Sequence, residues 1–136
     1  MDAPEVRRRT MQAVKSKNTR PEMYVRRLLH AQGYRYRLHK RGLPGCPDLV
    51  FSSRRKVIFV HGCFWHGHDC ARGARVPLHN RAYWINKLSR NKERDEAARA
   101  ALIASGWKVA VIWECEIGAE ARIGPRLRKF LGIPKQ

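Results

Sequence analysis

The stretch from Val57 to Cys70 constrains the fold of this chain more than any other. It begins with the apolar run V-I-F-V and then places three histidines and two cysteines within ten residues. A run that is apolar on both faces is typical of a strand in the middle of a sheet. We therefore predict a central strand over residues 56–61 that carries a functional site at its carboxyl end.

The patterns on either side predict one α/β domain with a central sheet flanked by helices. A capping box at 19–22 predicts a helix to about residue 32. The further expected elements are strands over 34–38, 47–51, 56–61 and 107–113, a long helix over 81–105, and a last helix over 125–131. A strand–helix–strand crossover makes the last two strands parallel and adjacent. We expect residues 1–18 to form a basic arm and residues 19–136 to form one domain.

The cysteines and histidines indicate a zinc site. Zinc prefers four thiolate or imidazole ligands in a tetrahedron, and Cys63, His68 and Cys70 can supply three of them from one loop. Cys115 follows the other parallel strand, so the crossover can bring it to the same edge of the sheet as the fourth ligand. Cys46 is expected to be a bystander. The alternative is a set of four reduced, buried cysteines, because metal ligation or free thiols, rather than disulfides, are expected in a reducing cytoplasm.

The charge of the chain favours a nucleic-acid partner. Lys and Arg number 29 against 11 Asp and Glu, which gives a net charge of +18. A basic surface binds a nucleic acid favourably because its binding releases the counterions of the phosphates. Part of this charge lies in the arm, where Arg7, Arg8, Arg9, Lys15 and Lys17 are candidate DNA contacts; a solvated tail is the alternative. No apolar run approaches the roughly 20 residues that span a bilayer, so we expect no membrane contact.

Acidic residues are rare in the first two thirds of the chain, and their positions are informative. Between Val6 and Lys92 the only acidic residues are Glu22, Asp48 and Asp69. A carboxylate on a surface that binds phosphate weakens binding unless it holds a divalent cation, and oxygen ligands suit Mg²⁺. Asp48 lies at the start of a predicted strand and is the candidate; its alternative is an ordinary turn residue before a strand.

Several segments of the sequence resemble those of a known protein family. The segments that carry the likeness are L-P-G-x-P-D at 43–48, H-G-C-F-W-H-x-H-x-C at 61–70, Trp84, residues 91–95, and G-W with V-I-W-E-C within 106–115. The chain resembles the very-short-patch repair (Vsr) endonucleases, a zinc-containing branch of the restriction-endonuclease-like fold. The resemblance implies a three-layer fold with a central mixed sheet and one structural zinc site. It also implies nicking of one DNA strand 5′ to the T of a T·G mismatch, the product of 5-methylcytosine deamination.

The resemblance further implies that Asp48 and the backbone carbonyl of Val60 hold a catalytic Mg²⁺. The wider nuclease superfamily has an acidic-x-Lys pair on the following strand, and this chain, like Vsr enzymes, has histidines instead. The zinc set leaves His66 free as a general base, since histidine titrates near neutral pH.

Three more residues match positions of the family active site. His61 is expected to pair with Asp95, with a strand-end histidine of no catalytic role as its alternative. Glu22 is a further active-site carboxylate, although the capping box also explains it. For Asp95 the alternative is a surface pair with Asn91 or Arg94. The three other histidines, His30, His39 and His79, are expected to lie on the surface.

Two adjacent aromatic residues follow Cys63. We expect Phe64 and Trp65 to form a wedge that enters a weakened base step, because mismatched bases unstack at the lowest cost; burial of either ring is the alternative. The resemblance adds Trp84 to this wedge. Trp107 and Trp113 flank a buried strand and are expected in the core.

Together, the residues and the resemblance predict a Mg²⁺-dependent, zinc-stabilised DNA mismatch endonuclease. It is expected to act as a monomer on double-stranded DNA with a T·G mismatch, in the bacterial cytoplasm at the nucleoid. The resemblance implies mismatch-repair proteins and a companion cytosine methyltransferase as partners. One alternative is a Vsr-like nicking enzyme of relaxed mismatch choice that serves a restriction–modification system. Another is a non-catalytic zinc module that binds nucleic acid.

Overall fold

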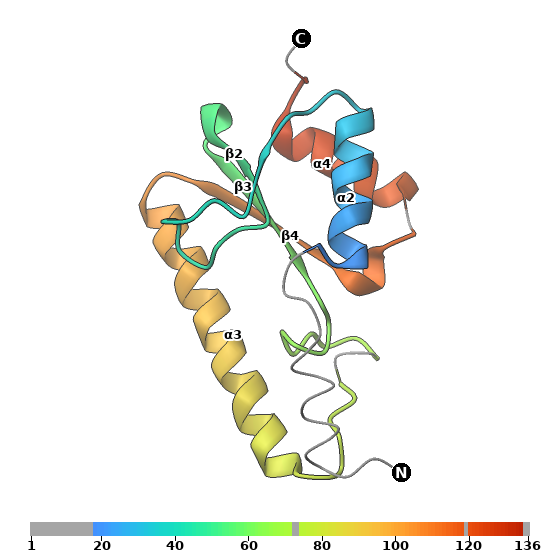
Figure 1. Ribbon diagram of the computed structural model, residues 1–136, viewed down its shortest axis with the longest axis vertical. Coiled ribbons are helices and arrows are strands. Elements are labelled where there is room, and N and C mark those ends of the chain that lie inside the picture. Colours follow the sequence, from blue (N-terminus) through green and yellow to red (C-terminus); the bar gives the residue numbers. More distant parts are fainter. Residues whose placement is uncertain (1–17, 72–73, 119, 135–136) are drawn as a thin grey trace.

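The computed structural model describes residues 18–71, 74–118 and 120–134 of the chain. The elements are α2 (Arg20–Ala31), β1 (Arg37–Leu38), β2 (Leu49–Phe51), β3 (Lys56–His61), α3 (Arg81–Ala104), β4 (Lys108–Trp113) and α4 (Glu120–Leu131) (Figure 1). Short 3-10 turns at Ser52–Arg54 and Glu114–Glu116 follow β2 and β4. The expected order of elements is confirmed.

The four strands form one mixed sheet in the order β1-β2-β3-β4. The first two pairs are antiparallel, and β3 pairs with β4 in parallel from Lys56↔Lys108 to His61↔Trp113. Helix α3 is the crossover between the parallel strands, as predicted. Both strands therefore end at the same edge of the sheet, with Cys63 following one end and Cys115 following the other.

Helices cover both faces of the sheet and make three layers (Figure 1). Side chains of α2 and α4 pack on one face, and Leu102 of α3 packs on the other. The buried residues on the first face are Val25, Leu28, Leu29, Tyr34, Leu49, Phe51, Ile58, Ile112, Ile123, Leu127 and Leu131. Those on the second face are Val50, Val57, Phe59, Leu102 and Trp107. Because β3 supplies buried residues to both faces, it is the central strand that its sequence predicts.

Helix α2 begins at the predicted capping box. The Thr19 side chain accepts a hydrogen bond from the backbone N–H of Glu22 at 3.4 Å, which satisfies one free donor of the first turn. The carboxylate of Glu22 reaches back to the N–H of Asn18 at 3.2 Å. Gly33, at φ +96°, adopts the left-handed conformation that ends the helix. This start places Glu22 in the first turn, where it is 1% exposed.

Two expected boundaries are wrong by a wide margin, and β2 begins at Leu49 where the sequence predicted Pro47. The strand expected over 34–38 is reduced to Arg37–Leu38, because the N–H of Tyr34 closes the end of α2 by bonding to the carbonyl of Leu29 at 3.0 Å. The helix expected from Pro125 begins at Glu120, with Pro125 in its interior. Burial of three α4 side chains in the first core outweighs the hydrogen bond that proline cannot donate.

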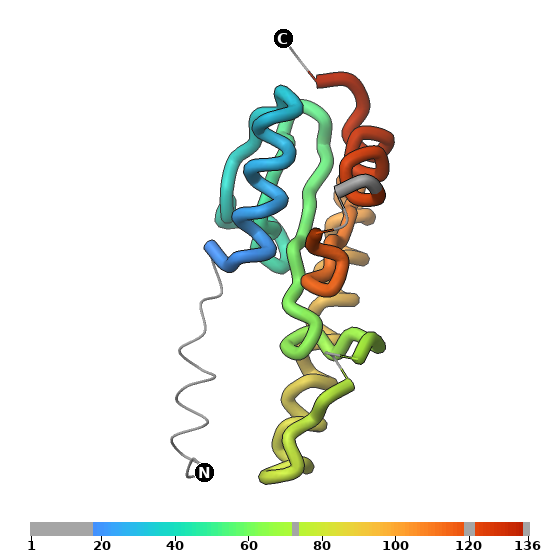
Figure 2. The backbone as a smooth tube through the Cα atoms, turned by 90° about the vertical axis from the view of Figure 1, so that its right-hand side faces the viewer, coloured from blue at the N-terminus to red at the C-terminus, as the bar shows by residue number. Residues whose placement is uncertain are grey.

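The segment after β3 extends past the end of the sheet and lies beside the N-terminal half of α3 (Figures 1 and 2). A hydrogen bond joins the two, from the Asn91 side chain to the carbonyl of Trp65 at 2.8 Å. This segment carries most of the predicted site. Along the described residues, no helix is long and apolar enough to cross a membrane.

Candidate active site and metal centre

The four predicted zinc ligands come together at the shared edge of β3 and β4. One ligand atom from each of Cys63, His68, Cys70 and Cys115 lies within 4.8 Å of the others. The N–H of Cys115 donates to the sulfur of Cys63 at 3.3 Å, so the backbone itself ties the two strand ends together. Cys46 is exposed and lies outside this cluster, as expected.

The chemistry of this donor set fits a zinc ion. Three thiols and an imidazole are a standard structural zinc shell. Burial raises the pKa of the Cys63 thiol to about 12, and burial also raises that of Cys115. A cation would offset the cost of a buried Cys63 thiolate and the repulsion between neighbouring thiolates, since thiol ligands lose their protons when they bind metal.

A second cluster joins two predicted residues, Glu22 and Asp48, to one that sequence reasoning placed on the surface. His39 is 14% exposed, and its Nε2 lies 2.9 Å from Oε2 of Glu22 and 3.9 Å from Oδ1 of Asp48. The expectation for His39 is wrong because β1 pairs with β2: Leu38 lies opposite Leu49, so the next residues, His39 and Asp48, face each other. A strand register between two short segments leaves no signal in hydrophobic periodicity.

Asp48 is held tightly and is mostly buried. Its Oδ2 accepts a hydrogen bond from the backbone N–H of Val60 at 2.6 Å, which links the start of β2 to the end of β3. Burial raises the pKa of Asp48 to about 7; the N–H of Val60 opposes this shift and the nearby Glu22 adds to it. Two carboxylates in one buried site repel each other unless a proton or a cation lies between them.

A third cluster contains His61, His66 and Asp95. The rings of the two histidines stack at 3.7 Å with an angle of 4° between their planes. Nδ1 of His66 lies 2.6 Å from Oδ2 of Asp95. The expected pairing of Asp95 with His61 is therefore corrected: its hydrogen bond goes to His66, which projects from the loop toward α3. The alternative surface pair is also excluded, since Arg94 bonds to Asn91 instead.

His61 is buried and loses affinity for protons. Burial lowers the pKa of His61 to about 4, and the adjacent His66 acts in the same direction. The ring of Trp113 meets His61 edge-on at 5.2 Å and stacks on the zinc-cluster residue His68 at 4.0 Å. Trp113 is half-buried and lines the cleft described below, so its expected place in the core is only partly right. Trp107 is buried in the second core as expected.

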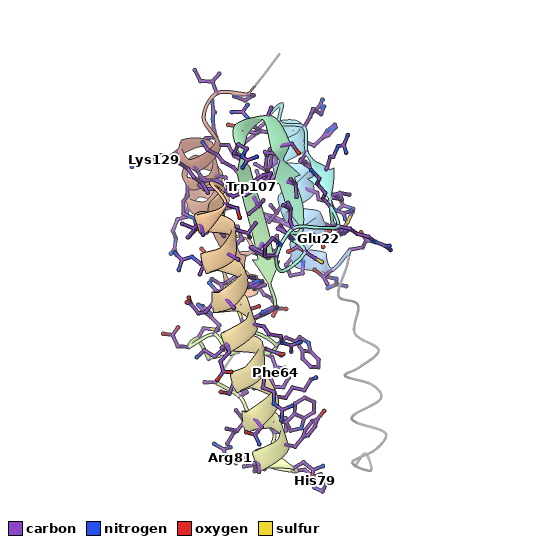
Figure 3. All side chains as sticks on the ribbon, turned by 90° about the vertical axis from the view of Figure 1, so that its left-hand side faces the viewer. Glu22, Phe64, His79, Arg81, Trp107 and Lys129 are labelled. Atoms are coloured by element: carbon purple, nitrogen blue, oxygen red, sulfur yellow. The ribbon has the colours of Figure 1, made fainter. Side chains whose placement is uncertain are left out.

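Phe64, Trp65 and Trp84 form an aromatic cluster at the N-terminal part of α3, where Figure 3 shows Phe64. Ring centroids lie 5.2 Å apart for Phe64 and Trp65, 5.6 Å for Phe64 and Trp84, and 6.0 Å for Trp65 and Trp84. Trp84 is only 5% exposed, whereas the other two rings are half-buried. The buried ring of Trp84 thus supports the more exposed rings of Phe64 and Trp65.

One cleft of about 1480 Å³ connects the second and third clusters and reaches Phe64 and Trp65. It is lined by Asp48, Val60, His61, His66, Asp95, Phe64 and Trp65, together with the basic residues Arg20, Arg41, Lys87, Lys92 and Arg99. The second cluster lies at the α2 side of this cleft, and the third lies at the α3 side. The predicted contacts Arg7, Arg8, Arg9, Lys15 and Lys17 lie outside the described residues.

A basic cleft that ends in buried carboxylates and paired histidines is the kind of site that enzymes acting on the phosphodiester backbone of nucleic acids possess. The family whose sequence model is described as "DNA mismatch endonuclease Vsr" matches residues 1–72. The chain belongs to the Vsr family of DNA mismatch endonucleases.

Individual relatives extend the match over nearly the whole chain. The chain is 55% identical over 129 residues to Type II nicking enzyme V.XorIIP of Xanthomonas oryzae pv. oryzae, covering 95% of this chain and 94% of the relative. It is 41% identical to Type II nicking enzyme V.NmeAIP of Neisseria meningitidis, covering 89% and 86%. It is 37% identical to DNA mismatch endonuclease Vsr of Escherichia coli, covering 86% and 74%. The family fold is the restriction-endonuclease-like fold, which agrees with the three layers and mixed sheet.

Proposed function

We propose that this protein nicks one strand of duplex DNA 5′ to the T of a T·G mismatch, with Mg²⁺ at Asp48 and a structural zinc ion at the four-residue cluster. The observation that carries the proposal is the position of Asp48. It is a mostly buried carboxylate at the wall of a basic cleft that also contains the paired histidines. A module that only binds DNA gains nothing from such a carboxylate.

The residues around Asp48 suit a hard divalent cation. Oδ2 is occupied by the N–H of Val60, while Oδ1 remains available toward the cluster with Glu22. In an extended strand the N–H and C=O of one residue lie on the same edge, so the carbonyl of Val60 faces the Asp48 side. A Mg²⁺ ion held there supplies charge stabilisation for the phosphate that is cleaved.

Activation of the attacking water is assigned to His66. A neutral His66 that donates its Nδ1 proton to Asp95 keeps the lone pair on Nε2, which can take a proton from the water. The hydrogen bond of 2.6 Å fixes both the tautomer and the orientation of the ring. His61, whose pKa is about 4, stays neutral at pH 7. It therefore adds no positive charge beside the charge that His66 gains when it takes the proton from the water.

Zinc at the Cys/His cluster has a structural role in this proposal. All four ligand positions are filled by protein side chains, so no coordination site remains for substrate. The cluster fixes the loop that carries Phe64, Trp65 and His66. The two aromatic rings are the wedge that tests a base step, braced by Trp84.

The test is a nicking assay on a matched set of duplexes with T·G, the other mismatches and matched pairs, with and without Mg²⁺. Asp48→Ala should abolish nicking while preserving binding of a labelled T·G duplex measured by fluorescence anisotropy. Glu93→Ala, which removes an exposed carboxylate of α3, is the matched control. Mg²⁺-dependent nicking by Asp48→Ala at the wild-type rate would refute the proposal.

A second candidate function differs in substrate choice. The relatives with 55% and 41% identity are both named Type II nicking enzymes, which favours a nicking enzyme that serves a restriction–modification system and tolerates other mismatches. Comparable nicking rates on several mismatches in the same assay would select this function over strict T·G repair.

A further inference from the structure

His39 occupies a position that the proposed mechanism leaves unexplained. It follows β1 directly, and Asp48 precedes β2 directly. The N–H of His39 donates to the carbonyl of Asp48 at 3.1 Å, which continues the β1–β2 pairing by one residue. This backbone bond holds the His39 side chain and the Asp48 carboxylate on adjacent chain segments, with Glu22 of α2 arriving from the neighbouring layer.

The imidazole of His39 is aimed between two carboxylates. Its Nε2 lies 2.9 Å from Oε2 of Glu22 and 3.9 Å from Oδ1 of Asp48, and one ligand atom from each of the three residues lies within 4.8 Å of the others. Yet Nε2 is buried, and no residue in the described part of the chain meets it with the geometry of a hydrogen bond. A buried nitrogen without an aligned partner is costly. Ligation of a cation would satisfy it.

The surrounding charges leave room for such a cation. Arg26, one turn further along α2, forms an ion pair with Glu22, and Asn18 donates its N–H to the other carboxylate oxygen. Asp48 receives the N–H of Val60 on Oδ2. Its Oδ1 is the oxygen that faces His39. The atoms directed at one another across the cluster are therefore Nε2 of His39, Oδ1 of Asp48 and Oε2 of Glu22, the last of which Arg26 also contacts.

We propose that His39 is a ligand of the divalent cation held by Asp48, with Glu22 as the third member of a two-carboxylate, one-histidine site. This inference rests on the cation site of the proposed function and extends it by one residue and by a metal preference. Mg²⁺ favours a shell made of oxygen ligands and water. A nitrogen ligand favours transition-metal cations over Mg²⁺, so this site should bind Mn²⁺ more tightly than Mg²⁺.

The test uses Mn²⁺ as a spectroscopic probe on the zinc-loaded full chain, with and without a T·G duplex. Mn²⁺ lies at the weak end of the affinity order for protein sites, so it should leave the thiolate cluster to zinc. Pulsed electron paramagnetic resonance of bound Mn²⁺ detects a directly coordinated imidazole nitrogen through its hyperfine coupling. Competition between Mn²⁺ and Mg²⁺ gives the metal preference.

His39→Asn is the main variant, because His39 has φ +47° and asparagine tolerates the left-handed conformation while being too short to reach the cation. His39→Gln is the second variant, and it offers an oxygen ligand in place of nitrogen. His79→Gln removes an exposed histidine at the far end of the molecule from Glu22 and is the matched control (Figure 3). Circular dichroism checks that each variant is folded.

We expect the nitrogen coupling in wild type and in His79→Gln, and its loss in both His39 variants. Mn²⁺ affinity should fall by about tenfold or more, and the preference for Mn²⁺ over Mg²⁺ should shrink in His39→Gln. Mn²⁺ that binds at Asp48 without nitrogen coupling would overturn the role of His39 and leave the nuclease proposal intact. A coupling that persists in His39→Asn would assign the nitrogen to the stacked histidines and would also overturn it. If Asp48→Ala binds Mn²⁺ as tightly as wild type, the result would instead refute the cation site at Asp48 itself.

Discussion

Nδ1 of His66 lies 2.6 Å from Oδ2 of Asp95, and this contact ties the loop of the Cys/His cluster to the middle of helix α3. In the proposed mechanism the carboxylate holds the imidazole in one tautomer, so that Nε2 can accept a proton. The geometry matters more than the charge alone, because an incorrectly oriented ring cannot reach the attacking water.

Asp95→Asn should therefore lower the rate of nicking strongly while sparing DNA binding. An amide can present its N–H to Nδ1 and impose the other tautomer, and loss of a general base costs about 10²–10⁴-fold in rate. Single-turnover nicking and anisotropy measure the two quantities separately. Glu96→Gln, one residue further along the same helix, should behave as wild type. Equal loss in both variants would mean that the negative charge of the cleft wall, and not the contact with His66, carries the effect.

Replacement of Asp48 should stabilise the protein at high pH. The folded pKa of Asp48 is raised from 3.8 to about 7, so the folded state holds this proton more tightly than the unfolded chain. The resulting stability is complete below pH 4 and is lost as the pH rises through 7. Asp48→Asn removes this loss and should raise the free energy of unfolding at pH 8 by up to about 4 kcal/mol. Urea denaturation of the zinc-loaded protein at pH 4.5 and pH 8, without added Mg²⁺, measures the difference.

His61 provides the opposite dependence on pH. Its folded pKa is lowered from 6.5 to about 4, so its contribution to stability is present above pH 6.5 and is lost as the pH falls toward 4. In wild type the two effects oppose each other between these limits. The stability of Asp48→Asn should therefore rise with pH across this range, while that of wild type stays nearly constant. Parallel curves for the two proteins would contradict the assignment for Asp48, and an Asp48→Asn curve that does not rise with pH would contradict the assignment for His61.

The Cys/His cluster should hold one zinc ion per chain. Cys115→Ser should lower zinc affinity by at least about tenfold and destabilise the protein, since ligand binding energy contributes to folding. Metal analysis after dialysis against a moderate chelator, together with thermal unfolding, measures both effects. Cys46→Ser, which removes the exposed cysteine outside the cluster, should keep its zinc. A wild-type chain that contains far less than one equivalent of zinc would exclude the site.

The wedge should determine the preference for mismatched DNA. In the double variant Phe64→Ala and Trp65→Ala, the ratio of nicking rates on T·G and matched duplexes should fall by about tenfold or more, because stacking on one base contributes about 1–3 kcal/mol. Leu78→Ala, which truncates a residue that is 86% exposed on the loop before α3, is the control. An unchanged ratio in the double variant would remove these rings from mismatch recognition.

The sequence predicted the site best where one element carries the signal. Cys63, His68 and Cys70 lie in one loop, and the crossover rule correctly placed Cys115 beside them. The prediction failed for His39, whose partners come from α2 and β2 and are brought together only by strand register. It also failed for the partner of Asp95, since the choice between His61 and His66 depends on which ring the loop turns toward α3.

The two wrong boundaries also arise where the contacts that a residue makes in the fold outweigh its local preference. Tyr34 has strong strand propensity, but its N–H is used to close α2. Pro125 is normally read as a helix start, yet Ile123 on its N-terminal side is buried with Leu127, so the helix extends through it. At Tyr34 a local helix-capping hydrogen bond decides against the preference of the residue, and at Pro125 burial in the core does so.

Helix α3 carries the brace of the wedge at Trp84 and the partner of the proposed base at Asp95. These residues are 11 positions apart, which in an α-helix is a rise of about 16 Å. Asn91, between them, is bonded to the loop that carries Phe64 and Trp65. The helix therefore holds the proposed wedge and the proposed base at a fixed separation. The distance from the disturbed base step to the cut phosphate would then be a property of helical geometry. An inserted turn in α3 would displace the nick along the strand rather than only weaken it.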